Sequence, residues 1–174
     1  MEDTKGKTIL IVDDEPDIQL YLQTILENAG FGVAVAGNGN QALNKVTQQK
    51  PDAISLDLVM PKMSGLKFFR YIKKNKDRAD IPFVVVSAHG KDEFGKGDLD
   101  KIKKESKGGY IDFVEKPVKP SLYVDAIRKA VGLAALESAT DERYSLMAKL
   151  QDEMRSADKT KLKKALDIFG KEKE

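Results

Sequence analysis

Short apolar runs rich in β-branched residues alternate along the chain with segments of helical periodicity. The runs occupy residues 8–12, 31–36, 51–58, 81–86 and 110–114. Mostly apolar runs of this length are typical of parallel strands that are buried on both faces. The segments between and after them repeat apolar residues every three or four positions, as amphipathic helices do. The alternation predicts an α/β protein with a doubly wound, five-stranded parallel sheet and helices on both faces.

Local signals place the ends of the predicted helices. Pro16 suits the first turn of the helix after the first strand, which closes at Ala29 and Gly30. A second helix is predicted over 41–49, after a turn at Asn38 to Asn40, and Ser64 is a plausible N-cap for a third. In the last predicted helix, 121–131, four residues are available for burial: Leu122, Val124, Ile127 and Val131.

Two parts of the chain depart from this alternation. Residues 91–109 are charged and contain four glycines, and only Leu99 and Ile102 offer an apolar face, so we expect any helix there to be short and weakly anchored. From Leu133 onward no strand-like run occurs, and two apolar stripes predict two amphipathic helices or one interrupted helix. We therefore expect a domain over residues 1–132 and a C-terminal α-helical extension over 133–174.

Composition excludes several classes of site. The chain has 174 residues with 41% hydrophobic content, enough for one core of ordinary domain size. It has no cysteine and one histidine, which excludes disulfides, thiolate metal sites and histidine metal clusters. The net charge is only +2, and the segment after Leu133 balances its charges, which speaks against nucleic-acid or anionic membrane partners. The polar N-terminus carries no signal-like run, and we expect a cytoplasmic protein.

Candidate chemistry gathers where the predicted strands end. Asp13 and Asp14 follow the first strand, Asp57 the third, Ser87 the fourth and Lys116 the fifth. In a doubly wound sheet the carboxyl ends of the strands meet at one edge, so these side chains should converge. Three carboxylates in one crevice repel one another and need compensating cations. The residue types predict a Mg²⁺ site with a lysine beside it.

These residues carry a resemblance to a known family. The segment Asp57 to Gly65, with the acidic pair, Ser87 and Lys116-Pro117, resembles the phosphoacceptor pattern of response-regulator receiver domains. The similarity covers roughly Lys7 to Val131. It implies a flavodoxin-like fold with strand order 2-1-3-4-5, as in chemotaxis regulators.

The resemblance also implies roles for single residues. Asp57 is the expected phosphoacceptor, and the metal ligands are expected to be Asp13, Asp14, Asp57 and the backbone carbonyl of Val59. Ser87 is implied as the hydroxyl that moves to the phosphoryl group, and Lys116 as the cation that contacts it. Pro117 is expected to follow a cis peptide bond, and Phe113 falls where the family carries a switching aromatic residue.

Two departures from the family pattern bear on activity. The interval from Ser87 to Lys116 is longer than usual and weakens the fourth helix, which belongs to the usual output face. Val59 and His89 lie where family members differ in residues that tune hydrolysis of the phosphoryl group. The Val59 side chain cannot orient a water molecule, so we expect a relatively long-lived phosphoryl group.

The sequence thus favours a two-component receiver that is not an enzyme. It would accept a phosphoryl group from a sensor histidine kinase or a histidine phosphotransfer protein, and signal to a downstream protein by contact, without a DNA-binding domain. One alternative is a phosphoaspartyl hydrolase, but such enzymes carry Asp-x-Asp, whereas Asp13 and Asp14 are adjacent. Another is a phosphorylation-independent scaffold whose helical tail packs on its own domain or forms a homodimer.

Overall fold

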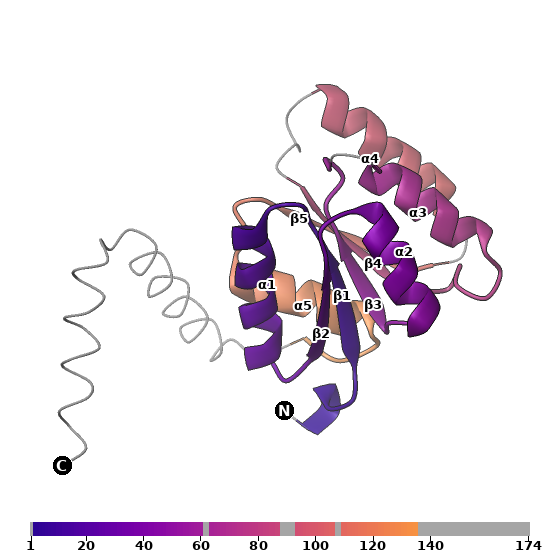
Figure 1. Ribbon diagram of the computed structural model, residues 1–174. Helices are drawn as coiled ribbons and strands as arrows, with labels where there is room; N and C mark the ends of the chain where they lie inside the picture. The colour runs from indigo at the N-terminus through magenta and orange to yellow at the C-terminus, as the bar shows by residue number, and fades with distance from the viewer. Residues whose placement is uncertain (1, 61–62, 88–92, 107–108, 136–174) are drawn as a thin grey trace, which may run out of the picture. The chain divides into compact units, whose positions relative to one another are not determined.

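A parallel five-stranded sheet forms the centre of the protein (Figure 1). We describe it from a computed structural model, over residues 2–60, 63–87, 93–106 and 109–135. The strand order is β2-β1-β3-β4-β5, which confirms the predicted flavodoxin-like topology. The strands are β1 (Thr8–Val12), β2 (Gly32–Ala36), β3 (Ala53–Leu56), β4 (Phe83–Ser87) and β5 (Ile111–Glu115).

Helices cover both faces of the sheet (Figure 1). They are α1 (Pro16–Asn28), α2 (Gly39–Gln48), α3 (Gly65–Lys74), α4 (Glu93–Glu105) and α5 (Pro120–Ala130), with a short 3-10 helix at Glu2–Thr4. Helices α1 and α5 contact each other on one face, and α3 contacts both α2 and α4 on the other. Helices α1 to α4 each return the chain to the start of the next strand, so all strands end at one edge.

Capping residues determine where two of the helices begin. Asn38 accepts hydrogen bonds from the backbone N–H groups of Asn40 and Gln41, and Ser64 accepts one from Lys67. These side chains satisfy N–H groups that have no partner within the helix. The N-cap predicted at Ser64 is confirmed, whereas α2 begins at Gly39, two residues before the predicted start.

One hydrophobic core cluster lies between the sheet and the α2–α3 layer. Three aromatic side chains, Phe68 and Phe69 of α3 and Phe83 of β4, are fully buried there. The rings of Phe69 and Phe83 meet edge to face with centroids 5.0 Å apart, a favoured aromatic geometry. Helix α3 is therefore held to the sheet by a large apolar contact.

The structure corrects two sequence predictions. The helix expected to be short within 91–109 is α4, which has 13 residues, as many as α1, and contains Gly95 and Gly97. Glycine weakens a helix by only about 1 kcal/mol per residue, which tertiary contacts can offset. In α5, Val124 and Ile127 are fully buried as predicted, whereas Leu122 is 58% exposed and its neighbour Tyr123 is fully buried.

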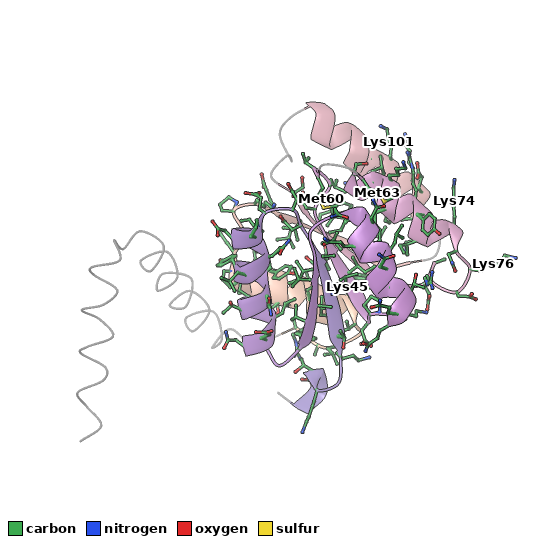
Figure 2. All side chains as sticks on the ribbon, in the orientation of Figure 1. Lys45, Met60, Met63, Lys74, Lys76 and Lys101 are labelled. Carbon is green, nitrogen blue, oxygen red and sulfur yellow. The ribbon has the colours of Figure 1, made fainter. Side chains whose placement is uncertain are left out.

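Residues 136–174 lie outside the described part of the chain, and with them the predicted helical tail and its proposed pairing. Among the described residues, no helix is long and apolar enough to span a membrane. The side chains of the described residues are drawn in Figure 2.

Candidate functional site

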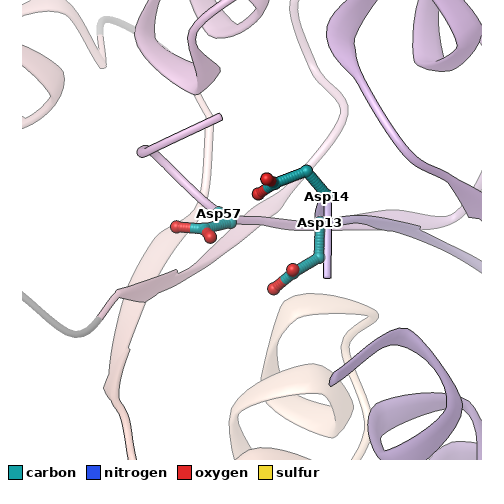
Figure 3. A group of neighbouring side chains, drawn as sticks. All are labelled: Asp13, Asp14 and Asp57. Carbon is teal, nitrogen blue, oxygen red and sulfur yellow. The ribbon is translucent and has the colours of Figure 1, made fainter. Parts of the chain in front are cut away.

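Three carboxylates meet at the edge where β1 and β3 end. Asp13 and Asp57 are almost completely buried, and Asp14 is partly exposed. Backbone hydrogen bonds extend the sheet to this point: the N–H of Asp13 donates to Ala36, and the N–H of Asp57 donates to Val12. One carboxylate oxygen from each aspartate lies within 4.8 Å of the others (Figure 3). The predicted convergence of these residues is present in the structure.

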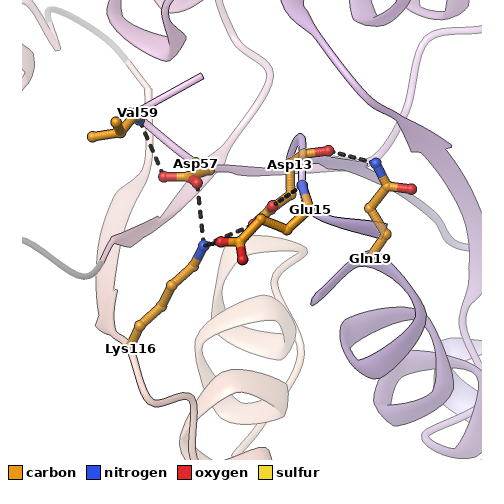
Figure 4. Close-up of polar contacts among 6 residues, drawn as sticks. All are labelled: Asp13, Glu15, Gln19, Asp57, Val59 and Lys116. Atoms are coloured by element: carbon orange, nitrogen blue, oxygen red, sulfur yellow. Dashed lines mark hydrogen bonds and ion pairs between the residues drawn. The ribbon is translucent and has the colours of Figure 1, made fainter. Parts of the chain in front are cut away.

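Lys116 brings a positive charge into this acidic cluster. Its Nζ lies 2.9 Å from Asp13 Oδ2 and 3.1 Å from Asp57 Oδ2, and 3.7 Å from the exposed Glu15 carboxylate (Figure 4). Lys116 directly follows β5, so the fifth strand supplies the cation for carboxylates of the first and third. One lysine cannot neutralise three carboxylates, and the cluster keeps an excess of negative charge.

Burial and neighbouring charges shift the pKa values of Asp57 and Lys116. Burial raises the pKa of Asp57, the Asp13 charge adds to the effect, and Lys116 together with the Val59 N–H opposes it without cancelling it. Burial by itself lowers the pKa of Lys116, but hydrogen bonds and charges from Asp13 and Asp57 outweigh it, so the net pKa lies above its ordinary value. Lys116 is therefore a cation, and any further positive charge nearby would stabilise the ionised form of Asp57.

The loop after β3 places an exposed residue, Val59, beside the buried Asp57. The Val59 N–H donates to Asp57 Oδ1 at 3.2 Å, while the Val59 side chain is 58% exposed. Gly65, which begins α3, lies directly against this loop: a Cβ there would lie 2.1 Å from the Asp57 carbonyl oxygen. Because Gly65 has no side chain, α3 can begin close to Asp57, the candidate phosphoacceptor.

Two residues of α1 support the site and were not predicted from the sequence. The Gln19 side-chain amide donates to the Asp13 carbonyl at 2.5 Å, and Tyr21 Oη donates to the Val118 carbonyl at 3.0 Å. Both lie on α1, where they resemble ordinary helix residues, so no local signal marks them. Tyr21 anchors the loop that follows Lys116, and the Lys116–Pro117 peptide bond is cis, as the resemblance implied.

The other predicted residues occupy the expected strand positions. Ser87 ends β4 and is 6% exposed, and its carbonyl accepts the Lys116 N–H at 3.0 Å. Phe113 of β5 is partly buried against the core, with Lys103 Nζ 5.2 Å from its ring centroid. His89 lies outside the described residues. The roles implied for Ser87, Phe113 and the Val59 carbonyl remain predictions.

The donor set fits a hard divalent cation. Carboxylate oxygens are the ligands that Mg²⁺ prefers, and it is held in proteins by one or two of them together with water. Asp13, Asp14 and Asp57 supply such oxygens in one cluster with unbalanced negative charge. No histidine or cysteine lies among them that would favour a softer metal.

Comparison with known proteins identifies the class of this domain. The response regulator receiver domain family matches residues 9–128, more than half of the chain. The chain belongs to this family. Receiver domains are signalling modules of two-component systems.

Individual relatives agree with this assignment. The chain is 36% identical to the chemotaxis protein CheY of Thermotoga maritima over 71% of its own length and 97% of the relative. It is 36% identical to the phosphate regulon transcriptional regulatory protein PhoB of Pseudomonas aeruginosa, covering 66% of this chain but only 47% of that regulator. The solved receiver domain of a Pseudomonas aeruginosa sensor histidine kinase has a TM-score of 0.64 and 24% identity, over 73% of this chain and 98% of that one; it holds magnesium in its active-site cleft.

Proposed function

We propose that this protein accepts a phosphoryl group on Asp57, with Mg²⁺, from a histidine kinase or a histidine phosphotransfer protein, and signals by contact with a downstream protein. The observation that carries the proposal is the buried cluster of Asp13, Asp14 and Asp57 with Lys116 Nζ 3.1 Å from Asp57. Family membership supports the same reading.

The residues of the site can perform this transfer. A carboxylate oxygen of Asp57 attacks phosphorus, the oxygen–phosphorus bond forms, and the nitrogen–phosphorus bond of a donor phosphohistidine breaks. The imidazole keeps the electron pair and takes a proton from water. Asp13, Asp14 and Asp57 would hold Mg²⁺, which supplies positive charge for the phosphoryl oxygens when bound. Lys116, held as a cation, would contact another of these oxygens.

Labelling by a small phosphodonor tests the proposal. We expect acetyl phosphate with Mg²⁺ to add one phosphoryl mass to the intact chain, and chelation of the metal to prevent it. Asp57→Asn should abolish labelling, because it removes the attacking oxygen. Asp77→Asn is the matched control, since Asp77 is an exposed aspartate outside the site. Unchanged labelling of Asp57→Asn would contradict the proposal and favour the scaffold alternative.

A second part of the proposal concerns the lifetime of the acyl phosphate. The exposed Val59 side chain lies next to Asp57 and has no group that could orient an attacking water molecule. We therefore expect slow hydrolysis, and Val59→Asn should shorten the half-life of the purified phosphoprotein. Hydrolysis of Val59→Asn that is no faster than that of the wild type would count against this role of Val59.

A further inference from the structure

A basic face lies on α3 and α4, away from the acidic cluster. Helix α3 carries four basic residues and no acidic one, and residues 101–105 of α4 carry three lysines and one glutamate. The two segments together have seven basic residues and one acidic residue, although the whole chain has 30 basic against 28 acidic residues. Because the two helices contact each other, this charge is concentrated in one area.

Two of the lysines, Lys73 and Lys103, have structural roles that the contacts show directly. Lys73 donates to the carbonyls of Ala79 and Ile81, and Lys103 stacks over Phe113. The outward-facing side chains are exposed: Lys74 on α3, and Lys101 and Lys104 on α4. Within the described part of the chain, no carboxylate forms an ion pair with Lys74 or Lys104. Figure 2 shows Lys74 and Lys101 on the same side of the domain.

The centre of this face already binds a carboxylate. Arg70 Nε and Nη2 donate to the two oxygens of Glu105 at 2.7 and 2.6 Å, a bidentate geometry. Glu105 has a lowered pKa, first because of the Arg70 hydrogen bond and then because of charges that include Lys101 and Lys74. These lysines are therefore close enough to act on the same carboxylate. Tyr71, 54% exposed on α3, adds an aromatic surface beside them.

The face lies at the opposite edge of the sheet from the acidic cluster. Lys73, in the last turn of α3, contacts Ile81, which precedes β4, and a Cβ on Gly109, which precedes β5, would lie against Lys73. Both helices thus end where the strands begin, whereas Asp57 lies where the strands end. Binding at this face would not require the acidic cluster to be modified.

We propose that the α3–α4 face, formed by Arg70, Tyr71, Lys74, Lys101 and Lys104, is a docking site for an acidic segment of a partner protein. The bidentate pairing with Glu105 shows that the face accepts a carboxylate, and Tyr71 offers an apolar contact of the kind that protein interfaces use. Nucleic acid fits less well, because the whole chain carries a net charge of only +2 and specific DNA interfaces bury on the order of 1,000 Å² or more, beyond a few helix turns. The partner's carboxylates would bind the lysines and compete with Glu105 for Arg70.

Fluorescence anisotropy with a labelled synthetic peptide of glutamate, aspartate and leucine tests this on the full chain. We expect saturable binding that weakens with salt, and a loss of about tenfold in affinity for Lys74→Glu and for Lys101→Glu. Lys129→Glu is the charge-matched control, because Lys129 is exposed on α5 in the other helix layer. Circular dichroism would verify that each variant is folded.

A gain-of-affinity variant separates docking from a merely structural effect. Glu105→Gln removes the competing carboxylate, so it should tighten peptide binding, whereas loss of a structural contact would only weaken it. Asp57→Asn should bind the peptide as the wild type does, which keeps this test independent of phosphoryl transfer. Peptide binding that is absent, or equal in Lys74→Glu and Lys129→Glu, would overturn the proposal. Tighter binding of a single-stranded oligonucleotide or of anionic vesicles through the same lysines would overturn it as well.

Discussion

Helices α3 and α4 lie side by side but are held to the domain by different forces. Five residues of α3 are buried, among them Phe68, Phe69 and Ile72. Among the α4 side chains that the structure describes, Ile102 is the one that is buried; Glu105 forms an ion pair with Arg70, and Lys103 lies over Phe113. Apolar burial is strong and indifferent to salt, whereas exposed ion pairs are weak and screened. Helix α4 should therefore move more easily than α3.

The largest expected effect on stability comes from a substitution in α3. Phe69→Ala removes a fully buried ring that packs against Phe83, and should lower the free energy of unfolding by about 3–5 kcal/mol. The loss should be the same at low and high salt, because the contact is apolar. Urea denaturation measures it. A loss of unfolding free energy no larger than that of a variant at an exposed site would contradict the proposed difference between α3 and α4.

Ile102→Ala tests the apolar anchor of α4. Truncating a buried isoleucine costs about 2–5 kcal/mol in general, but here α4 can detach by itself, which limits the loss to the lower part of that range. We expect amide hydrogen exchange to accelerate in α4 while α3 stays protected. Equal acceleration in both helices would show that the two are one cooperative unit.

Two glycine substitutions should have opposite signs. At Gly97 in α4 an added Cβ would meet nothing within 4 Å, so Gly97→Ala should stabilise the protein by about 0.5–1 kcal/mol. At Gly65 in α3 the added Cβ would collide with the Asp57 carbonyl, so Gly65→Ala should destabilise it. Thermal unfolding of both variants checks the signs, and stabilisation by Gly65→Ala would contradict the close packing of α3.

The smallest effect concerns pH. The Arg70 hydrogen bond holds the pKa of Glu105 below its ordinary value near 4.5. Because the folded-state pKa is the lower one, the ion pair stabilises α4 above pH 4.5 and this contribution disappears as the pH falls through the folded-state pKa. Carbon-13 NMR titration of the Glu105 carboxyl measures the value. In Arg70→Gln the pKa of Glu105 should rise toward 4.5. An unchanged pKa would show that Arg70 does not cause the lowered value.

The sequence by itself determined the strands and the residues of the acidic cluster, and its resemblance to a known family implied the strand order. Each strand is a local apolar run, and the acidic residues lie just after the ends of two of them, so a sequence window is sufficient to find them. Because strands of a doubly wound sheet all end at one edge, Asp13, Asp14 and Asp57 could be brought together before any coordinates were known. Only their functional roles need experiment.

Tertiary structure alone decided the contacts between distant parts of the chain. The sequence predicted that Lys116 lies near the acidic cluster, but not that its Nζ donates to both Asp13 and Asp57. The supporting bonds of Gln19 and Tyr21 have no local signature. The burial of Tyr123 in place of Leu122 depends on how α5 is rotated against the sheet. The 13-residue length of α4, which contains two glycines, was likewise not evident from the local sequence. Local sequence patterns specify the helices and strands. Side-chain contacts depend on packing between elements that are distant in the sequence, so no single stretch of sequence predicts them.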